Sequence, residues 1–221
     1  MVVVKILLAA LAGYLLGSIS FSIWLSRLLG MDIRRKGSGN AGATNMARTF
    51  GWGPGLLTLA GDMCKAVLAM LIGYFMLGGA LRSSGPYGDW GLMAGGMAVM
   101  LGHCFPFMHD FRGGKGVAVG GITSLMVDWR VGCAVFGSFI VFALLSKKVS
   151  LGSVCGALAI TVASALLFAQ AQLSLPRLLL SVFSMSIVIF QHRENIKRLI
   201  KGTEPDFRAK GSREKQEEKV N

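Results

Sequence analysis

Three short polar segments interrupt a sequence that is otherwise rich in apolar residues, and their residue types suit the binding of an anion. The first reads GSGNAGATNMAR and runs from Gly37 to Arg48. Its glycines let a ligand approach the backbone amides, and the guanidinium of Arg48 suits an oxyanion. The neutral side chains of the segment add hydrogen-bonding groups, namely those of Ser38, Asn40, Thr44 and Asn45. A flexible glycine-rich connector would have a similar composition and is the alternative.

The second polar segment comprises GHCFP, from Gly102 to Pro106, and FRGGKGVA, from Phe111 to Ala118. A Gly-Gly-Lys-Gly turn that leads into a helix is suited to phosphate, because backbone amides and the helix N-terminus face the anion. Lys115 would add a positive charge. The sequence lacks the P-loop pattern GxxxxGK[ST] and predicts no preceding strand, so an ATP site is not indicated. A basic turn that only sets the orientation in a membrane is the alternative.

The third segment, QHRENIKR, runs from Gln191 to Arg198. In a helix, His192 and Asn195 would share a face, and Glu194 and Arg198 would be spaced for an ion pair. With an ordinary pKa of about 6.5, a histidine can exchange a proton near neutral pH. A histidine at the membrane interface with no part in chemistry is the alternative.

Two ionisable residues, Asp62 and Lys65, lie three positions apart inside an apolar stretch. Charged groups at membrane depth are costly and usually line a functional interior, so we expect this pair to support the site from below. His103 and Glu194 are expected to have the same supporting role. A lysine that reaches out to the membrane interface is the alternative for Lys65.

The elements that must position these segments are long apolar stretches, in a chain of 221 residues with a mean hydropathy of +0.58. About 20 apolar residues span a bilayer as a helix. The pattern predicts an all-α integral membrane protein with about seven transmembrane helices, at residues 3–29, 53–78, 90–108, 117–127, 130–145, 150–169 and 173–191. The fourth is too short to cross unaided. A rival interpretation joins the fourth and fifth into one span, 117–145, and gives six.

The distribution of basic residues favours seven spans with the N-terminus outside. This arrangement places 18 of the 23 Lys and Arg residues, and all three polar segments, on the inner side. Six spans would put the basic loop Arg34–Lys36 and the basic tail on opposite faces. The net charge of +12 therefore indicates anionic lipid as a partner, and no nucleic acid. Residues 1–202 form the predicted membrane domain, and residues 203–221 a charged, mobile cytoplasmic tail.

The four cysteines show neither a CxxC spacing nor a cluster with histidine, so neither a metal site nor a disulfide framework is predicted. They are Cys64, Cys104, Cys133 and Cys155.

Taken together, the polar segments resemble the three motifs of the bacterial glycerol-3-phosphate acyltransferases that use acyl phosphate, the PlsY family. GSGNAGATNMAR resembles the first motif, GHCFP with FRGGKGVA the second, and HRENIKR the third; the resemblance covers about residues 10–202. The chain departs from the family pattern at Met108-His109-Asp110, where the family is usually apolar with a glycine. Arg112 replaces a common lysine.

The resemblance implies a multi-pass enzyme of the bacterial cytoplasmic membrane that needs no cofactor and has its active site on the cytoplasmic side. It would transfer a fatty acyl group from acyl phosphate to the sn-1 hydroxyl of glycerol 3-phosphate, giving 1-acylglycerol 3-phosphate (lysophosphatidate) and phosphate. The implied catalytic residues are Ser38, Arg48, Lys115, His192 and Asn195. The expected substrate-binding residues are Gly37, Gly39, Asn40, Thr44, Asn45, Gly113, Gly114 and Gly116.

The proton acceptor is open between His192 and a substrate phosphate. We favour the phosphate, because an acyl phosphate is already activated. An acyl-enzyme on Ser38 is less favoured, since no base lies beside it in the sequence. The rival class is an organic-anion or phosphate transporter, which would need polar residues on both sides of the membrane.

Overall fold

In the computed structural model, which describes residues 1–79 and 87–206, every regular element is helical. The helices are α1 (Val2–Ser18), α2 (Phe21–Leu28), α3 (Ala43–Phe50), α4 (Trp52–Met76), α5 (Gly88–Cys104), α6 (Val117–Val127), α7 (Trp129–Ser146), α8 (Val149–Ala169), α9 (Leu175–Gln191) and α10 (Arg193–Ile200). Two short 3-10 helices, η1 (Ile33–Arg35) and η2 (Phe107–His109), lie in the loops. The prediction of an all-α protein is confirmed for the described residues.

Five helical stretches are long and apolar enough to cross a membrane, and a sixth is added if the bent pair α9–α10 counts as one span. The first of them joins α1 and α2. Helix α6 has 11 residues, which corresponds to about 16 Å at 1.5 Å per residue. The prediction of an integral membrane protein therefore agrees with the fold, while the count of seven spans and the outward-facing N-terminus stay predictions.

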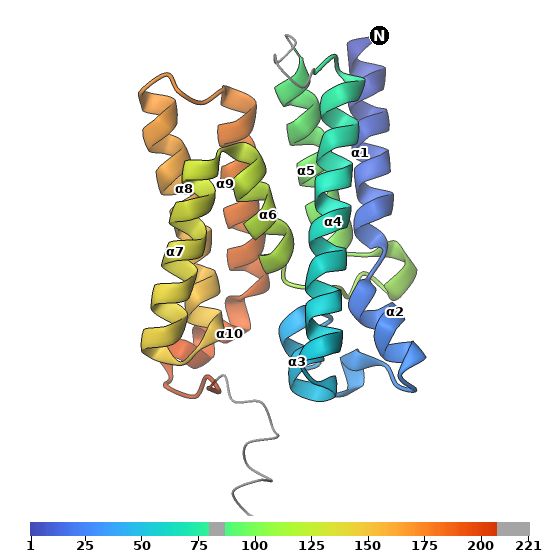
Figure 1. The fold of residues 1–221 in the computed structure, drawn as a ribbon, viewed down its shortest axis with the longest axis vertical. Coiled ribbons are helices and arrows are strands. Elements are labelled where there is room, and N and C mark those ends of the chain that lie inside the picture. Colours follow the sequence, from blue (N-terminus) through green and yellow to red (C-terminus); the bar gives the residue numbers. More distant parts are fainter. Residues whose placement is uncertain (80–86, 207–221) are drawn as a thin grey trace, which may run out of the picture.

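The helices form two neighbouring groups that run along the long axis of the molecule (Figure 1). Helices α1, α4 and α5 pack together in one group, and α7, α8 and α9 pack in the other. Helix α6 lies between them and contacts both α4 and α9. The N-terminus is at one end, and α2, α3 and α10 lie at the opposite end (Figure 1).

The chain reverses direction between α6 and α7, so the alternative prediction of one span over 117–145 is wrong. Asp128 has an extended backbone and accepts a hydrogen bond from the amide of Arg130 at 2.9 Å, which caps the start of α7. The two helices pack back to back, with Leu125 of α6 against Gly132 of α7. A single span over 117–145 would have needed a continuous helix through Asp128.

Small residues hold the first group together. Gly73 of α4 and Gly91 of α5 lie so close that a Cβ on either would meet the backbone of the other. Gly17 of α1 approaches Gly102 of α5 in the same way. Close backbone approach of this kind is how helices gain packing energy in lipid, where the hydrophobic effect gives little.

Candidate active site

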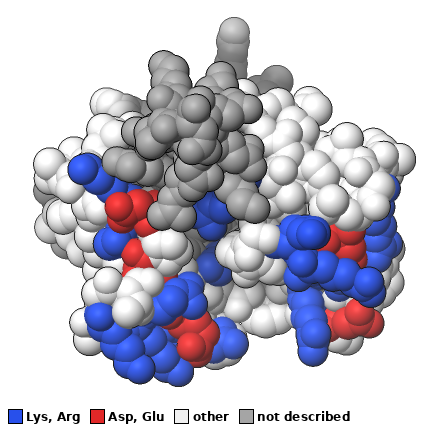
Figure 2. Space-filling view, turned by 90° about the horizontal axis from the view of Figure 1, so that it is seen from below, with Lys and Arg blue, Asp and Glu red and all other residues white. Residues whose placement is uncertain are grey.

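All three predicted polar segments lie in the half of the molecule opposite the N-terminus (Figure 1). The basic side chains of this end form two groups on either side of a recess (Figure 2). Contacts bring the segments and their flanking residues together: Arg34, just before the first segment, donates a hydrogen bond to the carbonyl of His109, within the second loop. Lys115 donates one to the side chain of Asn195 in the third segment. The site is therefore built from loops far apart in the sequence.

Asn45 organises the first loop. Its side chain is buried, and its Nδ2 donates to the carbonyls of Ile33, Lys36 and Asn40 at 3.0–3.3 Å. Its Oδ1 accepts from the amide of Ser38 at 3.0 Å. We expected Asn45 to face substrate, but its hydrogen-bonding groups are engaged within the protein. It shapes the loop instead.

The tight fold of the loop explains its glycines. Gly37 has φ +59°, and a Cβ there would collide with the Asn45 side chain. Gly39 has φ +72°. Both conformations favour glycine. Ser38, between them, is exposed, while Asn40, Thr44 and Arg48 are partly exposed, so these four remain available to a ligand.

The second loop differs from the cradle that its sequence suggested. The amides of Gly113 and Gly114 donate to the carbonyls of Cys104 and His103, at 3.2 and 3.0 Å. These two amides are therefore engaged within the protein, and the expectation that they bind an anion is wrong. Gly116 has φ +78° and caps the N-terminus of α6, whose first amides lack intrahelical acceptors.

The third segment lies at a bend of 61° between α9 and α10. His192 is buried at the bend, and its Nδ1 lies 2.8 Å from the carbonyl of Val188. A carbonyl can only accept, so Nδ1 carries the proton, and in the neutral ring Nε2 keeps its lone pair. Asn195, also buried, accepts from Lys115 Nζ at 2.5 Å. The structure thus brings His192, Asn195 and Lys115 into one cluster.

A buried carboxylate, Glu204, completes this cluster and was missed in the sequence. Its oxygens accept from Asn195 Nδ2 and Arg198 Nε, both at 2.7 Å. Burial disfavours its charged form, but these hydrogen bonds outweigh burial and lower its pKa. Gly202, with φ +70°, turns the chain back toward the site. An acidic residue two positions after this glycine was the available signal.

The first residues of the predicted tail belong to the body of the protein. Lys148 Nζ binds the carbonyl of Glu204 at 2.6 Å and a carboxylate oxygen of Asp206 at 2.9 Å. Residues 203–206 of the predicted tail therefore contact the rest of the protein, while the boundary after residue 202 stays a prediction. The rest of the predicted tail, 207–221, lies outside the described residues.

Lys115 lies among charges from all three segments. Burial lowers its pKa below the ordinary 10.5; nearby Arg198 and Arg48 lower it further, while Glu204 acts in the opposite direction. Arg48 therefore lies close enough to Lys115 to affect its charge. This arrangement of cations around one partly buried lysine is suited to a phosphate group.

Below the loops, Asp62 and Lys65 form the buried pair expected from their spacing, with Nζ and Oδ1 2.7 Å apart. Lys65 Nζ also contacts the carbonyl of Ile19 at 2.7 Å and His103 Nδ1 at 3.2 Å. The carbonyl of His103 in turn accepts from the amide of Gly114. The pair is thus connected to the loop that carries Lys115.

Glu194 does not join the site. Its side chain is exposed and pairs with Lys197 at 3.0 Å, while Arg198 pairs with Glu204. The predicted pair of Glu194 with Arg198 is therefore wrong, because the buried carboxylate of Glu204 takes the arginine.

The geometry predicts that Glu204→Gln lowers kcat/KM about tenfold for the acyl transfer that the family resemblance implies. This is the loss expected when one charge-assisted hydrogen bond is removed. A glutamine can accept from Asn195 with its oxygen, but its amide then faces Arg198 Nε, another donor. The control is Asp206→Asn, which removes an exposed carboxylate of the same segment. Steady-state kinetics in lipid bilayers would measure both. Wild-type kinetics in Glu204→Gln would show that Asn195 does not depend on Glu204.

The chain is similar to known glycerol-3-phosphate acyltransferases. Residues 7–202 match a family model described as glycerol-3-phosphate acyltransferase. A glycerol-3-phosphate acyltransferase of Rubrobacter xylanophilus is 40% identical over 200 residues, which cover 90% of this chain and 94% of the relative. A second, from a Nostoc species, is 39% identical over 204 residues, 88% of each chain.

The fold is also similar to crystal structures of PlsY, an integral membrane glycerol 3-phosphate acyltransferase. The glycerol 3-phosphate form has a TM-score of 0.80 at 33% identity, covering 92% of this chain and 96% of that one. The lysophosphatidic acid form has a TM-score of 0.78 at 32% identity, covering 91% and 94%.

Proposed function

Because this chain belongs to the glycerol-3-phosphate acyltransferase family, we propose that it transfers a fatty acyl group from acyl phosphate to the sn-1 hydroxyl of glycerol 3-phosphate. The products are 1-acylglycerol 3-phosphate and inorganic phosphate. The observation that carries the proposal is the cluster of Lys115, Asn195 and His192, which joins two of the family's motifs at one point.

The reaction needs positive charge at the acyl carbonyl and the departing phosphate. The acceptor oxygen forms a bond to the carbonyl carbon, and the bond from that carbon to the phosphate oxygen breaks. Lys115 and Arg48 stabilise the negative charge that develops on these oxygens. Ser38 and Thr44 offer neutral hydrogen bonds to substrate oxygens, beside the exposed loop of Gly37 and Gly39.

The hydrogen bond of His192 to Val188 supports a positioning part for this histidine in the reaction. With Nδ1 donating to Val188, Nε2 accepts a hydrogen bond from the attacking hydroxyl and orients it. The leaving phosphate then takes the proton, since an acyl phosphate needs little activation by a protein base. Asn195 is held by Lys115 and Glu204 and fixes the position of the lysine charge.

The basic end of the molecule faces the cytoplasm of a bacterial cell, with the N-terminus outside. The concentration of Lys and Arg around the site, on α2, α3 and α10 and their loops, supports this orientation by the positive-inside rule (Figure 2). The acyl chain of the donor lies between the spans in lipid.

Phosphate release by purified protein in lipid bilayers tests the proposal. We expect release to require both acyl phosphate and glycerol 3-phosphate and to yield lysophosphatidate in equal amount. Turnover with acyl-CoA and none with acyl phosphate would refute the donor. Uptake of glycerol 3-phosphate into sealed vesicles without acylation would favour a transporter.

A further inference from the structure

A polar cleft of about 380 Å³ lies between the first and second loops. Every lining residue is charged, polar or glycine: Asp32, Arg34, Arg35, Gly39, Asn40, Asp110, Arg112 and Gly113. Asn40 lies two residues after Ser38, and Gly113 two before Lys115, so the cleft adjoins the proposed site. Its volume fits a small molecule.

One of the three arginines is structural. Arg34 Nη2 and Nε hold the carboxylate of Asp32 at 2.8 and 3.1 Å, and this contact lowers the pKa of Asp32 to about 2. Arg34 Nη1 reaches across to the second loop, to the carbonyl of His109 at 3.1 Å and to Asp110 Oδ2 at 3.8 Å. Arg34 therefore ties the two walls together, with its charge balanced.

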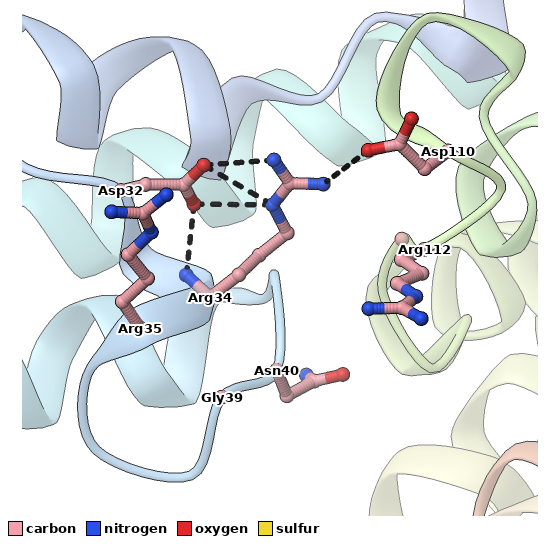
Figure 3. Close-up of a pocket in the computed structure, with 8 residues that line it drawn as sticks. Asp32, Arg34, Arg35, Gly39, Asn40, Asp110 and Arg112 are labelled. Carbon is pink, nitrogen blue, oxygen red and sulfur yellow. Dashed lines mark hydrogen bonds and ion pairs between the residues drawn. The ribbon is translucent and has the colours of Figure 1, made fainter.

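The other two arginines have no such partners. Within the part of the chain that the structure describes, neither Arg35 nor Arg112 makes a hydrogen bond or an ion pair with another side chain, and both are exposed. Figure 3 shows Arg112 and the amide of Asn40 on opposite walls of the cleft, with Arg34 beside them. An unpaired guanidinium group that faces a side-chain amide, as Arg112 faces Asn40, is suited to an oxyanion with several acceptors.

We propose that this cleft is an entry site for a soluble phosphate monoester, which Arg112 and Arg35 bind before it reaches Lys115. That the monoester is glycerol 3-phosphate rests on the proposed function. The cleft lacks an apolar wall, which a fatty acyl phosphate would need close to its phosphate group. Asp110, a departure from the family pattern, lies at the rim of the cleft with its side chain 86% exposed. Its carboxylate partly offsets the positive charge of the arginines that line the cleft.

Two variants, which are expected to change the KM for glycerol 3-phosphate in opposite directions, test the proposal in the full-length protein in lipid nanodiscs. For Arg35→Ala/Arg112→Ala we expect the KM for glycerol 3-phosphate to rise about tenfold, while kcat stays within twofold, because uniform binding is lost. For Asp110→Asn we expect the KM to fall about twofold, since the exposed carboxylate no longer repels the substrate. The control is Lys201→Ala, which removes one exposed positive charge near the end of α10.

An unchanged KM in the double variant would overturn the entry site. Equal KM increases in the double variant and in Lys201→Ala would also overturn it, because they would reflect only the net charge of the surface. A lipid headgroup is tested by adding phosphatidate to the nanodisc: competition with glycerol 3-phosphate in the wild type, absent in the double variant, would assign the cleft to lipid.

Equilibrium dialysis with radiolabelled glycerol 3-phosphate, without acyl donor, separates this proposal from the proposed function. Weaker binding by the double variant than by the wild type supports the cleft even if no turnover occurs. Turnover in the wild type, with equal binding by both proteins, leaves the acyltransferase intact and refutes the cleft.

Discussion

Lys115→Ala is expected to lower kcat/KM for acyl transfer about a thousandfold, the loss seen when one preorganised oxyanion donor is removed. Lys115 is the cation that joins the second loop to α10, through Asn195 Oδ1 at 2.5 Å. Its charge is partly shielded from water, so it acts on the developing negative charge more strongly than a surface lysine would. The measurement is steady-state phosphate release in bilayers, with product identified as lysophosphatidate.

The control is Lys197→Ala, which removes an exposed lysine paired only with Glu194. We expect its kcat/KM to stay within twofold of wild type. A loss in Lys115→Ala no larger than in this control would mean that Lys115 does not contact the reacting groups. Equal unfolding temperatures of the variants and the wild type would show that the loss is not one of folding.

The pH profile tests the charge of Lys115 by a second route. Burial lowers the pKa of this lysine, so its charge is lost as pH rises and before an ordinary lysine would lose its proton. The alkaline fall in kcat/KM should therefore begin below pH 10.5 in the wild type. In Lys115→Arg it should move to higher pH, because a guanidinium keeps its charge. If kcat/KM fell at the same alkaline pH in the wild type and in Lys115→Arg, the fall would come from the titration of another group.

The sequence predicted the long apolar helices and the meeting of the three segments, because both follow from patterns that tertiary contacts only modify, but it did not predict the short helices α3 and α10. Apolar length marks the helices that can cross a membrane, and the basic residues gather at one end of the bundle. The helical turn between Asp62 and Lys65 places both on one face, so their pairing was predictable too.

The roles within the loops were not predictable, because each depends on which acceptor a group meets in space. The amide side chain of Asn45 is of a type that can bind substrate, but in the folded loop its Nδ2 donates to three backbone carbonyls instead. Gly113 and Gly114 likewise turn their amides to the end of α5. Glu204 lies in a segment whose charge suggested a free tail, yet it is buried against Asn195 and Arg198.

The buried pair below the site gives the second large expectation: Lys65→Met should lower the free energy of unfolding by about 3–5 kcal/mol. Lys65 and Asp62 side chains are 4% and 3% exposed, so removing the lysine leaves a buried carboxylate that has lost its permanent cation and keeps His103 Nδ1 at 3.5 Å. Denaturation by sodium dodecyl sulfate, followed by tryptophan fluorescence, would measure the loss. Asp62→Leu should cost a similar amount, because it leaves the lysine charge unpaired.

The double variant Asp62→Leu/Lys65→Met tests why the single variants lose stability. The loss can come from an unpaired buried charge or from poorer packing of the new side chain. With both charges gone and apolar volume in their place, it should be more stable than either single variant. We nevertheless expect the single variants and the double variant to have a lower kcat for acyl transfer than the wild type. In the double variant Lys65 no longer contacts His103, whose carbonyl accepts from the amide of Gly114 in the loop of Lys115. Recovery of stability without recovery of kcat would separate the two roles of the pair. Additive losses of stability would show that Asp62 and Lys65 act independently, and wild-type kcat in the double variant would show that the pair does not position the loop.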